Sequence, residues 1–374
     1  MIDFRYHLVS LISVFLALAV GIILGAGPLK EAIGDQLTGQ VTSLRTEKEA
    51  LRAELDDANA TQEGSDTLLA AAAPKALAGA LPSRRVSVVL VGDVDSDVVD
   101  STSQYLAAAG ATVVSTVQLS DDWFSQAKAD SRQSYASSLA AYLAAGSTTD
   151  GYDTTLAHAL VLAFSGYSSV EADTFAAGAD LTREILVDSG LITIPEEPTA
   201  PADAYVVIEA GAAQTASTPA PTASAADSSL GATFATVLAA DAEGAVVTAT
   251  GSPAGTIVEA VTKDDTASST VTTVAGVDSV VGQFMLPLAL SERIGGTVAQ
   301  YADTTAASQV PVAATLGAPD RAALVALGAP ASSGDSTTGD TTTGGSTTEG
   351  KSDGSTTGDG SADGSSDADG ADGK

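Results

Sequence analysis

Residues 85–117, RVSVVLVGDVDSDVVDSTSQYLAAAGATVVSTV, carry the pattern of a strand, a helix and a second strand. The apolar run 86–91 is followed by glycine, which is typical of a strand buried on both faces of a parallel sheet. Residues 96–109 place apolar side chains on one helical face, and Gly110 follows as a C-cap. Residues 112–117 are rich in β-branched side chains and predict the second strand. A helical connection predicts that the two strands run parallel.

The alternation of strands and helices continues along the chain. Further strands are predicted at 204–208, 245–248 and 270–274. Helices are predicted around them, at 128–145, 170–188, 228–240 and 254–262. The apolar run 157–164 fits a helix or a strand equally well. This alternation predicts an α/β domain with a mostly parallel sheet over residues 85–318.

An uncharged run of 20 residues, 8–27, lies near the N-terminus. At a rise of about 1.5 Å per residue it reaches about 30 Å, the thickness of a bilayer's hydrocarbon core. We expect residues 1–27 to be a short head and a single transmembrane anchor in the cell membrane. A cleaved signal peptide is the alternative, but its apolar region is shorter and Pro28 directly follows the small residues. The α-amine gives the head a slight positive bias, so we expect a cytoplasmic N-terminus and an extracytoplasmic body.

Residues 28–60 predict a coiled-coil stalk. Steps of four and three residues join the members of one seam, which are Leu37, Val41, Leu44, Lys48, Leu51, Leu55 and Ala58. Glu47 then occupies position g and Arg52 the following e, which is the spacing of an interchain ion pair in a parallel dimer. We therefore expect a parallel homodimer through the stalk. The alternative is a single amphipathic helix that lies on its own domain. Residues 61–84, which contain Pro74 and Pro82, predict a linker.

Composition excludes several classes of function. With 16 Lys and Arg against 47 Asp and Glu, the net charge is −31, which argues against nucleic acid as a partner. The chain has no Cys and two His, so thiolate sites and disulfides are excluded. Residues 319–374 are rich in Gly, Ser, Thr and Asp, and they predict a disordered acidic tail. The P-loop string 345–352 lies in this tail, where it lacks the strand and helix that would shape it.

Three acidic residues, Asp93, Asp95 and Asp97, follow the first predicted strand. Sites of parallel sheets lie at the carboxyl ends of strands, so these residues are candidate ligands of a divalent ion, or a nucleophile and acid pair. The alternative is a helix start, where acidic side chains cap the first turn. The body's one histidine, His158, lies in an apolar stretch that predicts a partly buried structural role. No catalytic residue and no resident cofactor is predicted, and we expect no enzyme.

The N-terminal motif is Val9-Ser10-Leu11, then residues 14–19, then Gly21 and Leu24-Gly25. It resembles the start of the MctB-type copper transport proteins of actinobacterial envelopes. Residues 273–283 and 288–290 are similar to the family's valine–aspartate turn and the glycine-containing helix after it. Pro287 departs from this pattern and predicts a kink or a late start of the last helix.

The resemblance implies a role in copper homeostasis or efflux at a membrane, with copper ions as a partner. Cu(I) prefers thiolate and thioether ligands and Cu(II) prefers imidazole, whereas the body holds one Met and one His. We therefore expect carboxylate contacts, ligands shared between chains, or an indirect role. Two other hypotheses stay open. One is an envelope scaffold that uses the stalk and the α/β domain, and the other is a divalent-ion-dependent α/β hydrolase centred on Asp93 and Asp95.

Overall fold

The computed structural model describes residues 3–143, 151–168, 171, 173–211, 225–301, 310–319 and 321. The predicted disordered tail lies outside these residues, apart from its first residues Pro319 and Arg321.

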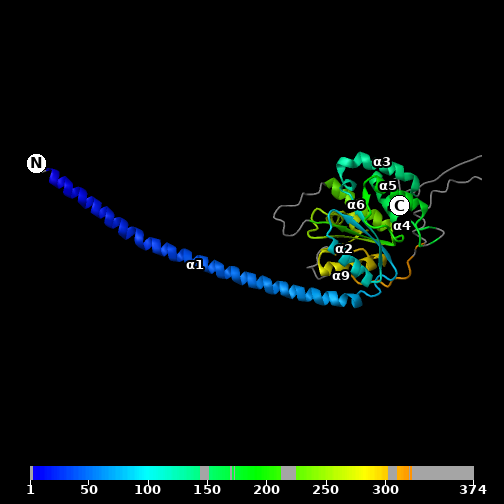
Figure 1. Cartoon of the computed structure of the whole chain (residues 1–374), viewed down its shortest axis with the longest axis horizontal. Coiled ribbons are helices and arrows are strands. Elements are labelled where there is room, and N and C mark those ends of the chain that lie inside the picture. The colour runs from blue at the N-terminus through cyan, green and yellow to red at the C-terminus, as the bar shows by residue number, and fades with distance from the viewer. Residues whose placement is uncertain are drawn as a thin grey trace, which may run out of the picture. The chain divides into compact units, whose positions relative to one another are not determined.

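The N-terminal part of the chain is one continuous helix, α1 (Asp3–Ala76), shown in blue in Figure 1. It contains the predicted anchor and stalk, and it continues through residues 61–76, where the sequence predicts a linker. The alanine-rich sequence there has high helix propensity, and Pro74 stands two residues before the helix ends.

The last turns of α1 pack on the body. Asp66 and Leu69 are half-buried, and Ala73, Leu77 and Ala80 are buried along the same side of the chain. This side contacts α9 (Val280–Ile294) and α2 (Ser96–Ala108). Residues 36–65, in contrast, are exposed throughout. The body therefore covers only the end of α1.

Seven strands of the described residues form one sheet in the order β3-β2-β1-β4-β5-β6-β7. Their bounds are β1 (Arg85–Val91), β2 (Thr112–Leu119), β3 (Ile192–Thr193), β4 (Ala204–Glu209), β5 (Gly244–Ala249), β6 (Thr272–Ala275) and β7 (Gln300–Tyr301). All neighbours are parallel except β2 and β3. The predicted mostly parallel sheet is confirmed.

Helices cover both faces of this sheet (Figure 1). The remaining helices are α3 (Ala129–Leu139), α4 (Tyr152–Ser165), α5 (Ala177–Asp188), α6 (Ala225–Asp241), α7 (Ile257–Lys263) and α8 (Asp265–Ser268). Val89 and Val207 face the core shared with α3 to α8, whereas Val88 and Val206 face the core shared with α2, α9 and the end of α1. Alternate side chains of a strand point to opposite faces, so this buried sheet reads as a continuous apolar run.

Three details were left open, missed or wrong in the sequence expectations. The ambiguous run 157–164 lies in α4, a helix buried on most sides, which hides its periodicity. Strands β3 and β7 have two residues each and carry no periodic signal of their own. Helix α9 begins at Val280 and continues past the buried Pro287, so the late start expected from this proline is wrong.

Candidate functional site

The strand order reverses between β1 and β4, which run side by side and parallel. Ligands of doubly wound sheets usually bind beside such a reversal, at the carboxyl ends of the strands. Here Gly92 and Ala210 are the first residues after the two strands. A β-carbon added to Gly92, whose φ is +74°, would lie 3.2 Å from the Ala210 β-carbon. The chain is thus closely packed at the position where a ligand would approach.

The three acidic residues predicted at this edge do not converge. Asp93, Asp95 and Asp97 are all exposed. Asp95 is the N-cap of α2, and its Oδ1 accepts a hydrogen bond of 3.0 Å from the Asp97 backbone N–H. Within the described ranges, no group of three His, Asp or Glu side chains could hold a metal ion. The geometry therefore supports the helix-start alternative for Asp95, and the hydrolase hypothesis gains no support from it.

One buried carboxylate, which the sequence does not single out, lies at this edge of the sheet. Glu209 ends β4 at the same edge, and its Oε2 accepts a hydrogen bond from the Ile257 backbone N–H at the start of α7. Burial raises the pKa of Glu209 to about 7, against the smaller opposing effect of this hydrogen bond. Its signal in the sequence is a single acidic residue directly after an apolar strand. Because its carboxylate caps α7, the geometry gives it a structural role.

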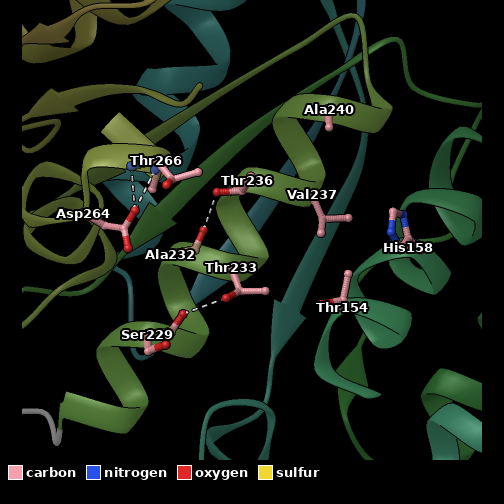
Figure 2. A pocket seen from close by; sticks show the side chains of 11 residues that line it. Thr154, His158, Ser229, Ala232, Thr233, Thr236, Val237, Ala240, Asp264 and Thr266 are labelled. Atoms are coloured by element: carbon pink, nitrogen blue, oxygen red, sulfur yellow. Dashed lines mark hydrogen bonds between the residues drawn. The ribbon is translucent and has the colours of Figure 1, made fainter. Parts of the chain in front are cut away.

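A groove of about 390 Å³ crosses the outer side of α6, between α4 and α8 (Figure 2). His158 and Thr154 line it from α4, beside Val237 of α6. The Nδ1 atom of His158 contacts Asp241 Oδ2, and both side chains are half-buried. The predicted partly buried His158 is confirmed, whereas its partner, 83 residues further along the chain, had no signal in the sequence.

Other polar groups of this groove are bonded to their own helices. The Thr233 hydroxyl donates to Ser229 O at 3.0 Å, and the Thr236 hydroxyl donates to Ala232 O at 2.9 Å (Figure 2). Asp264 Oδ1 accepts from the backbone N–H of Thr266 and of Ala267, at 2.9 and 2.8 Å. These bonds satisfy the hydroxyl and carboxylate groups locally rather than present them to a ligand.

A second exposed surface lies on one face of α1, within the predicted stalk. Six residues on one side of the helix form it, namely Leu44, Glu47, Lys48, Leu51, Arg52 and Leu55. The leucines of the predicted seam here are about 60% exposed. We call the predicted seam from Leu37 to Ala58 the stalk seam. It is the most prominent exposed apolar surface on α1 outside the anchor.

The predicted anchor is another exposed apolar surface among the described residues. Residues Phe4–Gly25 form the one stretch of the described helices that is long and apolar enough to cross a membrane, and none of it is buried in the body. A signal sequence would pass the same test of length and composition. The chain therefore belongs to the class of proteins in which one long helix, apolar at its N-terminal end, precedes a doubly wound α/β body.

Comparison with known proteins narrows that class to a family. The chain belongs to the family described as copper transport outer membrane protein, MctB, whose model matches residues 1–312. It is similar to the copper transporters MctB of Mycobacterium bovis and Mycobacterium tuberculosis, each 28% identical over 322 residues. Each alignment covers 83% of this chain and 99% of the relative. The family predicted from the N-terminal motif is confirmed.

Proposed function

We propose that this chain is a membrane-anchored protein that lowers the copper content of the cell. The single observation that carries this proposal is the extent of the family match, which spans anchor, stalk and body together. The relatives named as copper transporters are matched over 99% of their length, so the comparison concerns whole proteins rather than a shared domain.

Copper is the cargo in this proposal, and the chain's residues do not fit a soft binding site within one copy. The sequence contains no Cys. Met285 of α9 is buried in the core, and His158 is engaged with Asp241. Cu(I) binds best to thiolate and thioether groups, and Cu(II) to imidazole. We therefore propose that the chain acts on copper indirectly, or through weak carboxylate contacts or ligands shared between chains.

The proposed placement follows from the anchor. The uncharged run 8–27 would cross the membrane once, with the head, residues 1–7, in the cytoplasm and the α/β body outside. The support is an apolar length of 22 residues and the positive α-amine beside Arg5 in the head.

An envelope scaffold is the second candidate, and the stalk seam favours it. An exposed apolar face of this length needs a partner to cover it. In this alternative a recruited protein, rather than a second copy of the chain, covers the seam, and the α/β body serves as a second docking module.

A strain that lacks the gene separates these functions. The full chain should restore growth at high copper, whereas a chain whose residues 4–25 are replaced by a cleavable signal should not. Unchanged copper tolerance in the deletion strain would rule out copper handling. Loss of other proteins from the membrane fraction, with normal copper tolerance, would favour the scaffold.

Purified full-length chain tests whether the action is direct. In competition with a chelator, we expect Cu(I) affinity weaker than about 1 μM, because thiolates are absent. Tight Cu(I) binding would contradict the indirect mechanism without affecting the role in copper handling.

A further inference from the structure

We propose that a second copy of this chain covers the stalk seam, forming a parallel, in-register, two-stranded coiled coil. This inference does not depend on the role in copper handling.

The seam is apolar and exposed. Its leucines and valine, Leu37, Val41, Leu44, Leu51 and Leu55, are 46% to 63% exposed. Contact with the body begins only at Asp66, further along α1. The alternative in which the stalk lies on its own domain therefore leaves these side chains without a cover. Burying them against an identical helix removes apolar surface from water, which favours association.

The shape of the face suits a helix as the occupant. Leu44, Leu51 and Leu55 form one exposed face of the helix, and Glu47 and Arg52 lie beside them. In a coiled coil, each a or d side chain of one helix enters a hole made by four side chains of the other. Successive turns of an α-helix present such holes at regular spacing. A second helix fills them in register, whereas a partner without helical periodicity does not.

The charged residues beside the seam favour a second copy in a parallel arrangement. Glu47 at position g faces the following e position of the other helix, which is Arg52 in an identical, in-register chain. Lys48 at position a lies beside Glu47 of the second copy, so its ammonium group gains a carboxylate partner. An antiparallel pair would place g beside g and lose these contacts.

The anchor imposes the same direction. Helix α1 is continuous from Asp3 to Ala76, so the stalk is a direct extension of the segment proposed to cross the membrane. Two copies anchored in one membrane start at the same level and run the same way. Their seams then meet with little loss of entropy on association.

Single cysteines in the full chain test this proposal cleanly, because the chain has no Cys of its own. Leu44→Cys and Leu55→Cys place a thiol in the seam near its two ends, and Ala53→Cys places one at the outward position f as the matched control. Each variant is oxidised gently in native membranes and in detergent micelles. The fluorescence of Trp123, the one tryptophan, reports that the body is folded.

We expect a disulfide-linked dimer at both 44 and 55, at least about fivefold more than at 53. Dimer at only one seam position indicates an antiparallel pair and overturns the proposal. Dimer at neither position, or equally at all three, overturns it as well. In the Leu55→Cys background, Glu47→Arg should reduce the dimer, and Glu47→Arg together with Arg52→Glu should restore it in part, because Lys48 still lacks its carboxylate partner. No restoration would contradict the proposed parallel register.

Discussion

Arg321 reaches back across 118 residues of chain to Asp203, with 3.0 Å between Arg321 Nε and Asp203 Oδ1. Asp203 is fully buried, just before β4, and its carboxylate also accepts from the Arg85 backbone N–H at 2.8 Å and from the Tyr167 hydroxyl. A buried carboxylate is stable only when its oxygens are bonded. The body therefore depends on Arg321, three residues beyond its predicted end.

Replacing Arg321 by Ala should lower the free energy of unfolding by about 2 kcal/mol, because Asp203 loses its charged partner. Urea unfolding of the full chain in detergent, followed by Trp123 fluorescence, measures this change. The matched control is Lys263→Ala, which removes an exposed pair with Glu259 and should cost less than about 0.5 kcal/mol. Equal effects of the two variants would contradict the role of Arg321.

Gly282 lies in the first turn of α9, where a β-carbon would stand 2.1 Å from the Gly276 carbonyl oxygen. Gly282→Ala should therefore cost at least about 2 kcal/mol, since backbone has to move. A β-carbon added to Gly178 in α5 would have no atom of another part of the chain within 4 Å. Gly178→Ala should stabilise the protein by up to about 1 kcal/mol, because alanine favours the helix. The Tm of each variant tests this contrast, and a stable Gly282→Ala protein would refute it.

Glu209 should make stability depend on pH. Burial raises its pKa from 4.5 to about 7, so the folded protein keeps a proton that the unfolded chain releases. A pKa that is raised in the folded state gives stability that is complete below pH 4.5 and is lost as the pH rises through 7. Glu209→Gln keeps an acceptor for the Ile257 N–H and cannot lose a proton, so it should remove this loss. Between pH 4.5 and pH 8, the free energy of unfolding of the original chain should fall by about 1–3 kcal/mol more than that of the variant. Parallel pH profiles of the two proteins would show that Glu209 does not titrate as argued.

Asp95 should behave as a helix cap. Asp95→Ala should cost about 1 kcal/mol, and Asp95→Asn should cost little, because asparagine also caps helices well. Millimolar Mg²⁺ should leave the Tm of the original chain and of both variants unchanged. A Tm that Mg²⁺ raises in the original chain, and not in Asp95→Asn, would instead support the divalent-ion site.

Local sequence patterns predict most of the helices and strands. The strands β1, β2 and β4 to β6 follow apolar runs, and helices α2 and α5 follow periodic ones, so neighbours along the chain suffice to predict them. The strand order and the edge strand β7 depend on contacts between distant segments. The continuation of α1 past residue 60 was missed because two prolines and polar residues outweighed the alanine-rich run in the prediction of a linker.

The candidate site was less predictable for the same reason. Asp93, Asp95 and Asp97 stand out because they lie close together in the sequence. In the structure all three are exposed, and Asp95 caps α2. The contacts that matter join Glu209 to Ile257 and His158 to Asp241, residues 48 and 83 positions apart. Pairs of this kind are created by the packing of α4, α6 and α7 on the sheet, and the sequence alone does not indicate which residues meet.

The most direct test of the proposed function is the copper that cells retain. Cells lacking the gene, with and without the full chain restored, are loaded with copper, transferred to copper-free medium and assayed for cell-associated copper over time. We expect the cells without the chain to retain at least about twice as much copper as the restored cells. Equal copper content at every time, with the chain present in the membrane fraction, would contradict the account.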